Sequence, residues 1–176
     1  MIYYRELNID EITIDLFHAF ERRQVVTDCW RKENGKWVIK SDPFIDDWKK
    51  SDYEELIQCL KNTIVTKGLV YGAFINNELK GFVSVEGSLI GSNSQYMDLS
   101  CIHVSQDMRG QGIGRELFSA AKRFAREKNA KKLYISAHSA LESQAFYRAM
   151  GCKEAEEYNL EHVEKEPYDC QLECDL

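Results

Sequence analysis

The sequence is poor in proline and lacks long apolar runs. Only two prolines occur among its 176 residues, and no low-complexity tract interrupts the chain, which argues against a linker-rich or disordered protein. No apolar stretch reaches the roughly 18 residues that a membrane-spanning helix needs. Residues 1–7 show no basic segment followed by an apolar core, so we expect no secretory signal and a cytoplasmic location.

Patterns typical of metal sites and disulfide frameworks are also missing. The four histidines are scattered, and the six cysteines never form a Cys-x-x-Cys pair. We therefore expect free thiols in a reducing compartment and no bound metal. The formal net charge of −6 argues against a general nucleic-acid binder, which would present a basic surface. Neither a nucleic acid nor a membrane is expected as a partner.

The composition is that of a globular protein, with 44% hydrophobic and 30% charged residues, and the length suits one domain. The turn signal Asn34-Gly35 predicts a hairpin over 24–40 that ends at Asp42-Pro43. The apolar patterns predict strands at 1–7, 69–75, 80–86, 96–104, 132–136 and 168–176, a polar loop at 87–94, and helices over Ile12–Phe20, over Tyr53–Ile64, after Ile113 and after Ser143. Residues 153–166 fit a helix by propensity. Together these elements predict an α+β mixed sheet with helices on both faces.

The most informative stretch lies between an apolar strand and a helical stripe. Gly110, Gly112 and Gly114 give this loop backbone freedom and leave room for a close ligand. Main-chain N–H groups converge there at a helix N-terminus, with Arg109 and Arg115 beside them, which predicts a phosphate or diphosphate site. The P-loop does not fit, because no Gly-Lys-Ser/Thr follows, and Arg115 replaces the third glycine of the dinucleotide fingerprint. A glycine-rich turn before an ordinary helix is the alternative.

Two motifs together resemble those of one enzyme superfamily. The loop Arg109–Gly114 resembles the acetyl-CoA diphosphate loop of the GNAT acyltransferases, Arg/Gln-x-x-Gly-x-Gly/Ala. The stretch Ser143–Cys152 resembles their short helix ending in Phe/Leu-Tyr-x-x-x-Gly-Phe, with Cys152 in place of the final Phe. The order of the predicted elements is also the order found in this superfamily.

The resemblance implies a GNAT-like fold, in which a central, mostly antiparallel mixed sheet contains a splayed strand pair. It also implies a strand soon after Gly151, in place of the helix that propensity favours. On this reading residues 1–176 form a single N-acetyltransferase domain. Its parts are an acceptor-side half at 1–95, an acetyl-CoA-binding core at 96–152 and C-terminal strands at 153–176.

The resemblance further implies acetyl-CoA as the co-substrate. Main-chain groups of Ile102 and Val104 would line its pantetheine arm, and one N–H would stabilise the thioester oxygen. An ordinary paired central strand is the alternative for these residues. The implied coenzyme contacts are Ile102, His103, Val104, Arg109, Gly110, Gln111, Gly112, Ile113, Gly114 and Arg115.

Two side chains are candidates for catalysis. Tyr147 matches the family tyrosine near the coenzyme sulfur, where a phenol can donate a proton to the departing thiolate. Its alternative is a core aromatic with a satisfied hydroxyl. Asp98 stands where several family members carry a catalytic carboxylate, and its alternative is a solvated charge at a strand end. Strict alternation would place Asp98 on the face of Ile102 and Val104, and Cys101 on the opposite face. We therefore expect direct attack by the amine rather than a cysteine-linked intermediate.

The acceptor side is less defined. The superfamily usually walls its acceptor site with the segment after the first strand, which here contains Trp30 and Trp37 together with several aspartates. Aromatic faces and carboxylates favour a cationic amine, although core tryptophans and solvated aspartates would give the same pattern. Glu86 is a rival base and a further candidate acceptor contact.

The reading that results is acetyl transfer from acetyl-CoA to a primary amine of a small molecule. The alternatives are a protein or peptide N-acetyltransferase, a non-catalytic acyl-CoA sensor, and a different binder of nucleotide phosphates. Homodimers are common in the family, and the sequence itself does not decide the oligomeric state.

Overall fold

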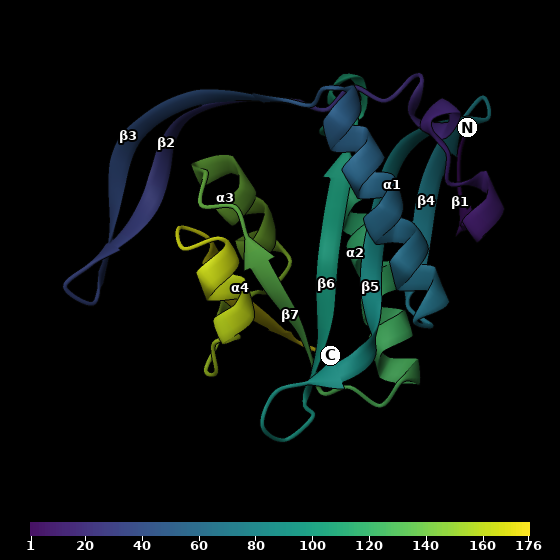
Figure 1. The fold of residues 1–176 in the computed structure, drawn as a ribbon. Helices are drawn as coiled ribbons and strands as arrows, with labels where there is room; N and C mark the ends of the chain where they lie inside the picture. The colour runs from purple at the N-terminus through teal and green to yellow at the C-terminus, as the bar shows by residue number, and fades with distance from the viewer.

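A computed structural model describes all 176 residues of the chain. Its centre is a seven-stranded sheet with the strand order β1-β4-β5-β6-β7-β9-β8 (Figure 1). Neighbouring strands are antiparallel except β6 and β7, which are parallel. The predicted α+β fold with a mostly antiparallel mixed sheet is confirmed. The strands are β1 Ile2–Glu6, β4 Leu69–Ile75, β5 Glu78–Ile90, β6 Tyr96–Val104, β7 Lys132–Ala137, β8 Lys153–Glu154 and β9 Cys170–Asp175.

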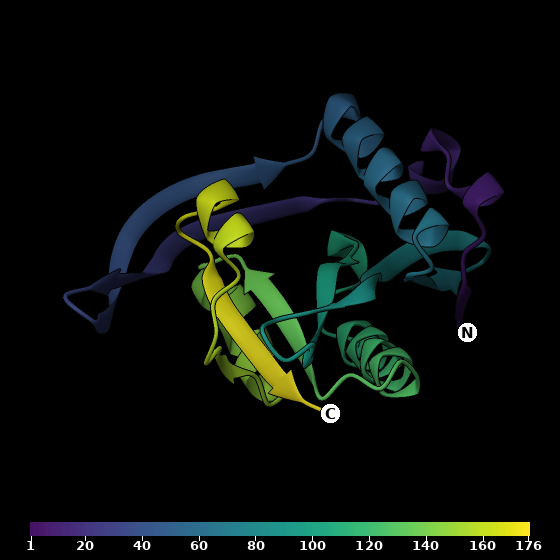
Figure 2. The ribbon, with the colours of Figure 1, turned by 60° about the horizontal axis from the view of Figure 1, so that its bottom comes forward.

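Two long helices, α1 (Lys50–Val65) and α2 (Ile113–Glu127), cover opposite faces of the sheet (Figures 1 and 2). Apolar residues three to four positions apart give each helix one face to bury. The α1 face packs with β4 and β5 around Phe74 and Phe82. The α2 face packs with β4, β5, β6 and β7 around Val83 and Leu133. The predicted helices at these positions are confirmed, as is α3 (Leu141–Ala149), which follows β7.

Strands β6 and β7 pair over only three positions, from Tyr96↔Lys132 to Asp98↔Tyr134. Beyond Asp98 they diverge, and Figure 1 shows β7 leaning away from β6. The main-chain edge of β6 that faces β7 is therefore unpaired from Leu99 onward. This is the splayed strand pair that the resemblance implied.

A second sheet consists only of β2 (Arg23–Glu33) and β3 (Lys36–Asp47), and it arches past α3 and α4 (Figure 2). The turn at Asn34-Gly35 is as predicted, with both residues at positive φ. The predicted end at Asp42-Pro43 is wrong. The register shifts between Val26 and Asp28, so β3 carries an extra residue there. Pro43 lies in this bulge, where no ladder N–H is required.

Two predictions in the first half of the chain need correction. The helix over Ile12–Phe20 is replaced by two 3₁₀ turns, Ile9–Glu11 and Ile14–Phe17, because the extended backbone of Thr13 interrupts it. The predicted loop at 87–94 is shorter than expected, because β5 continues to Ile90. Strand β5 passes so close to the end of α1 that a Cβ at Gly87 would lie 2.2 Å from the Thr66 oxygen.

Residues 153–166 contain both structures that were considered. The short strand β8 pairs with β9, and a short helix, α4 (Leu160–Lys165), follows it. The Asn159 side chain caps this helix by accepting a hydrogen bond from the His162 N–H at 3.1 Å. The expected strand is confirmed at 153–154 only.

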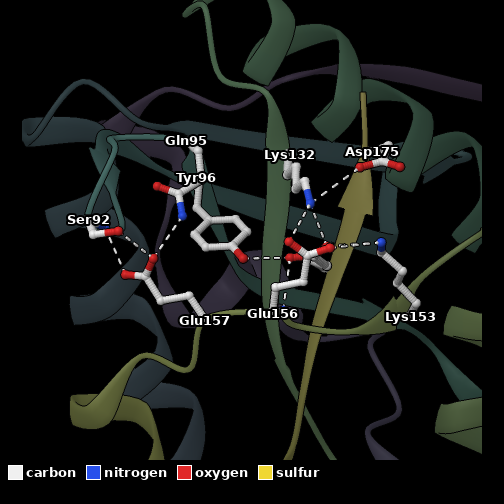
Figure 3. Close-up of polar contacts among 9 residues, drawn as sticks. Ser92, Gln95, Tyr96, Lys132, Lys153, Glu156, Glu157 and Asp175 are labelled. Atoms are coloured by element: carbon white, nitrogen blue, oxygen red, sulfur yellow. Dashed lines mark hydrogen bonds and ion pairs between the residues drawn. The ribbon is translucent and has the colours of Figure 1, made fainter.

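The last strand, β9, is not half-buried as its alternating pattern predicted. It lies between β7 and β8, so its polar residues are enclosed too. The Glu173 side chain is fully buried, and it accepts hydrogen bonds from Lys132 Nζ at 2.6 Å and from the Tyr96 hydroxyl at 2.5 Å. Burial alone would raise the pKa of Glu173, but these hydrogen bonds lower it. The side chains of Lys132, Lys153 and Tyr96 converge on Glu173 (Figure 3). They hold β6 and β7 together at the end where the two strands still pair, and the fork between these strands opens from that end.

Candidate functional site

The loop between β6 and α2 takes its shape from glycine. Gly110 and Gly112 have φ of 77° and 83°, a region that other residues rarely adopt. Gly114 serves packing instead, since a Cβ there would lie 3.0 Å from the Phe146 ring. The first main-chain hydrogen bond of α2 runs from the Glu116 N–H to the Gly112 oxygen at 3.2 Å. The amides just before it have no acceptor within the helix and point out of its N-terminus, which favours an anion.

A cleft of about 920 Å³ begins at this loop and follows the fork between β6 and β7. Its walls also include the start of the β2–β3 hairpin and one side of α3. Of the predicted coenzyme contacts, only Gln111 lies outside it, where its side-chain amide approaches Met108 Sδ at 3.8 Å. The predicted contacts that line the cleft are Ile102, His103, Val104, Arg109, Gly110, Gly112, Ile113, Gly114 and Arg115.

The unpaired edge of β6 presents main-chain groups to this cleft. The Ser105 N–H donates to the Lys80 oxygen at 2.8 Å, toward β5, whereas the Val104 oxygen accepts from Arg109 Nε at 3.3 Å. Since main-chain groups alternate along a strand, those of Ile102 and Val104 point to the open edge. The main-chain N–H and C=O groups of both residues are thus oriented to form hydrogen bonds with an extended ligand.

A bulge at Ser100 changes which side chains share a face of β6. Leu99 pairs with Val85 and Cys101 with Ser84, so two steps along β6 match one step along β5. The Ser100 hydroxyl lies 2.8 Å from Ser84 Oγ, which helps to hold the extra residue. Strict alternation therefore breaks at this point of the strand.

The bulge overturns the expected placement of Asp98. Leu99 before the bulge and Ile102 after it both pack toward α2. Asp98 consequently shares a face with Cys101 and lies opposite Ile102 and Val104. The expectation that Asp98 points to the same side as the cofactor-facing positions is wrong, and so is the expectation that Cys101 lies on the opposite face from it.

Asp98 is also outside the residues that line the cleft. It is buried, and its Oδ2 lies 2.7 Å from Nε2 of His162 in α4. The hydrogen bond to Asp98 raises the pKa of His162. The second carboxylate oxygen of Asp98 is buried without a partner. In this structure Asp98 anchors α4 to the sheet.

Tyr147, on α3, lines the cleft opposite β6. Its hydroxyl makes no hydrogen bond within the chain, in contrast to Tyr134, which donates to Gln171. Burial raises the pKa of Tyr147, and the nearby thiols of Cys152 and Cys101 add to this effect. The phenol therefore keeps its proton at neutral pH and remains free to donate it.

A carboxylate that the sequence did not single out, Asp169, lies on the same wall as Tyr147. It precedes β9, lines the cleft with Glu166, and accepts a hydrogen bond from the Ser136 hydroxyl at 3.0 Å. Burial raises the pKa of Asp169. Sequence reasoning missed it because only the fold brings residue 169 next to the end of β7, and no local motif marks it.

None of the three predicted acceptor contacts lines the cleft. Trp30 packs against the main core, with Arg148 over its ring, and Trp37 Nε1 donates to Glu154 at 3.3 Å. Glu86 accepts hydrogen bonds from the hydroxyls of Thr63 at 2.8 Å and Ser100 at 2.6 Å, so it reaches the cleft only through Ser100. Both tryptophans hold the hairpin against the body.

Other residues of the hairpin base take that place. Arg22, Gln24, Val25, Asp46 and Trp48 form this wall of the cleft. The Trp48 N–H donates to the Arg22 oxygen at 3.1 Å, which closes the hairpin at its base. The stretch of tryptophans and aspartates noted in the sequence thus does contribute to the cleft, but through its two ends.

The cysteines are all free thiols, as expected. No group of three or more His, Cys, Asp or Glu side chains is arranged to hold a metal ion. None of the helices combines the length and the apolar character needed to cross a membrane.

Comparison with known proteins identifies the family. Residues 23–152 match the acetyltransferase (GNAT) family, and since this match spans most of the chain, the protein belongs to that family. No curated protein matches the sequence significantly.

Solved structures of the same fold align over almost the whole chain. A putative streptothricin acetyltransferase from Bacillus anthracis str. Ames, in complex with acetyl coenzyme A, gives a TM-score of 0.71 at 17% identity and covers 100% of this chain and 99% of its own. Nourseothricin acetyltransferase gives 0.70 at 16% identity, with coverages of 99% and 98%. The PaiA N-acetyltransferase from Thermoplasma acidophilum, in complex with coenzyme A, gives 0.61 at 17% identity, with coverages of 100% and 99%. At these identities the likeness shows the fold alone.

Proposed function

We propose that this protein transfers an acetyl group from acetyl-CoA to a primary amine of a small molecule. One observation carries the proposal: the glycine loop, the unpaired edge of β6 and the free phenol of Tyr147 all face a single cleft. Membership of the GNAT family supports the reaction class. Acetyl-CoA and CoA in complexes of the same fold support the donor.

The donor would bind along the contiguous wall from β6 to α2. The free amides at the start of α2 suit a diphosphate, and Arg109 and Arg115 add positive charge at the same end. The amides of the pantetheine arm can pair with the open edge at Ile102 and Val104, as an added strand would. This pairing directs the thioester toward the interior of the fork.

The acyl transfer then needs few protein groups. The amine nitrogen attacks the thioester carbonyl carbon, and a main-chain N–H of the β6 edge stabilises the negative charge that develops on its oxygen. The C–S bond breaks, and Tyr147 donates its proton to the departing sulfur. The raised pKa of Tyr147 keeps this proton in place until the thiolate forms.

Attack by the amine is direct. Cys101 lines the cleft, but burial raises the pKa of its thiol to about 12. A thiol that stays protonated is a poor nucleophile. A cysteine-linked intermediate is therefore disfavoured by the protonation state of Cys101, rather than by the face on which the residue lies.

Asp169 is the carboxylate best placed to take the proton of the attacking amine. It lines the cleft and is close enough to Tyr147 to influence its pKa. Its own raised pKa brings the carboxylate closer to the range in which it exchanges protons near neutral pH. Asp98 and Glu86 are the alternatives, but neither lines the cleft, and only Glu86 forms a hydrogen bond with a lining residue, Ser100.

The shape of the cleft favours a small acceptor. Its volume of about 920 Å³ must hold the reactive end of the coenzyme as well as the acceptor, which leaves the acceptor less room than the roughly 300–1,000 Å³ of a typical small-molecule site at its upper end. The hairpin base adds the apolar side chains of Val25 and Trp48 to the lining.

Two measurements test the proposal together. Calorimetry with CoA, ATP and NAD should show tight binding of CoA only. Thiol release from acetyl-CoA over a panel of small amines and peptides should match the amount of acetylated product, with at least one small amine as a substrate. Binding of CoA with no release on the whole panel would indicate a sensor, and release with peptides alone would indicate a protein acetyltransferase. No CoA binding would reject the proposal.

A further inference from the structure

Arg22 is a buried arginine whose guanidinium is only partly paired. Its side chain is 8% exposed, and Nη2 donates to Asp46 Oδ2 at 2.8 Å. The Nε and Nη1 atoms are buried and have no hydrogen-bond partner. A guanidinium carries five N–H donors, and leaving charged donors unpaired away from water is costly. The N–H donors on Nε and Nη1 of Arg22 therefore remain available to a ligand.

The surroundings hold Arg22 in place at the wall of the cleft. Trp48 lies 5.2 Å from the Arg22 Cζ, measured to the ring centroid, and it also packs edge-on against His103 at 4.8 Å. Burial, together with a smaller effect of the nearby Arg22 and Arg109, lowers the pKa of His103 to about 3. His103 is therefore neutral near pH 7. Asp46 is the one carboxylate that forms an ion pair with Arg22.

The charges of the cleft are divided between its two sides. Arg22, Arg109 and Arg115 line one end of the cleft, near the tip of β6, where Asp46 pairs with Arg22. The acidic wall is formed by α3 and the segment before β9, and it consists of Glu142, Glu166 and Asp169. An ammonium group is attracted to the acidic wall, where the proposed proton acceptor lies. Since Arg109 and Arg115 are assigned to the diphosphate of the donor, an anionic group on the acceptor would be attracted to Arg22.

We infer that Arg22 binds a carboxylate of the acceptor, so that the acceptor is an amino acid or a similar molecule carrying both an amine and a carboxylate. The inference rests on the proposed function and narrows its substrate class. A carboxylate can accept two parallel hydrogen bonds from one guanidinium, which would engage the donors that the chain leaves unpaired. Recognition of this kind orients the acceptor with its amine toward Asp169.

Pairs of amines that differ only in the carboxylate provide the test. Lysine is compared with cadaverine, and 4-aminobutyrate with butylamine, using the full chain with acetyl-CoA. We expect kcat/KM to favour the carboxylate member by about 10- to 100-fold, the worth of a charged hydrogen bond. Arg22→Gln should abolish this preference, and Arg22→Lys should retain part of it. Arg23→Gln removes the same charge from the exposed neighbouring residue and should leave the preference intact.

The possible outcomes distinguish a failure of this inference from a failure of the proposed function. A preference that is absent in the wild type, or that survives Arg22→Gln, overturns it. A loss of CoA affinity in Arg22→Gln, with amine selectivity unchanged, assigns Arg22 to a coenzyme phosphate and also overturns it. If CoA binds but no amine releases thiol, the proposed function fails instead. In that case calorimetry can still test the role of Arg22, by comparing the Kd of lysine with that of cadaverine for the CoA complex. Equal Kd values would refute the inference. Thermal melts check folding, and the wild-type and Arg22→Lys data suffice should Arg22→Gln not fold.

Discussion

The two walls of the cleft are built in different ways. One wall consists of residues 99–104 of β6 and of the loop and helix start at 108–110 and 112–115, and it offers mainly main-chain groups and glycines. The other collects side chains from separate segments, among them Arg22, Tyr147 and Asp169. A wall of main chain can hold a constant part of a ligand with little dependence on side-chain identity. A wall of side chains can supply chemistry and choose the acceptor, and it exists only after the chain has folded.

The largest effect should come from the side-chain wall. Tyr147→Phe removes the hydroxyl that is proposed to protonate the leaving sulfur, and it keeps the ring. We expect kcat to fall about 100-fold or more, with CoA affinity unchanged. Tyr53→Phe is the matched control, since the Tyr53 hydroxyl donates to the Phe20 oxygen at 3.1 Å, away from the cleft. Steady-state thiol release and CoA calorimetry measure the two quantities, and an unaltered kcat removes Tyr147 from the chemistry.

The proton acceptor is the next test of the side-chain wall. Asp169→Asn should lower kcat/KM by about 100-fold near neutral pH and remove the acidic limb of its pH profile, since the activity of a carboxylate base rises with pH as it ionises. The raised pKa of Asp169 places that limb above the ordinary range for aspartate. Asp98→Asn should retain the limb and lower stability instead. The reverse pattern would return the role of base to Asp98.

The main-chain wall is tested through Gly112. Valine at this position would have to adopt a φ of 83°, and its side chain would project toward the anion site. We expect the Kd for CoA to rise about tenfold, which corresponds to roughly 1.4 kcal/mol. Gly35→Val introduces the same strain, at a φ of 76° in the hairpin turn, and should leave the Kd unchanged. Equal CoA affinity in the two variants would show that the loop does not contact the coenzyme.

The same contrast explains which parts were predictable from sequence. The loop and α2 follow from local patterns, namely glycines at fixed spacing and an apolar stripe, so their positions were predicted correctly. The role of Pro43 and the break at Thr13 were missed, because a bulge and an extended residue override local propensity. These errors concern local form, and the apolar residues Ile12 and Phe17 are still buried.

The site residues were missed for a different reason. A one-residue bulge at Ser100 reverses the faces of β6, and no glycine or proline marks it in the sequence. It therefore moved Asp98 away from the cofactor-facing positions. Asp169 and Arg22 reach the cleft through β9 and through the base of the hairpin, which are contacts between segments far apart in the chain. Periodicity cannot report such contacts, so these residues could be found only from the fold.

The smallest expected effect is on stability, and it concerns the contact that anchors α4 to the sheet. In this contact Nε2 of His162 lies 2.7 Å from Oδ2 of Asp98. The hydrogen bond to Asp98 raises the pKa of His162 above that of the unfolded chain, which is about 6.5. The charged pair therefore stabilises the fold fully below pH 6.5, and its contribution disappears as the pH rises through the folded pKa. His162→Gln keeps a donor for Asp98 but loses the charge, so it should cost about 1 kcal/mol at pH 5.5 and less at pH 8.5.

Urea melts at the two pH values measure this difference, with His18→Gln as the exposed control. A loss of stability that does not change with pH would mean that the contact acts through packing and hydrogen bonding alone. Loss of activity at pH 8.5 without loss of stability would mean instead that α4 positions the segment leading to Asp169. In that case the protonation of His162 would affect catalysis through the position of Asp169 in the side-chain wall. CoA binding at the main-chain wall would remain unchanged.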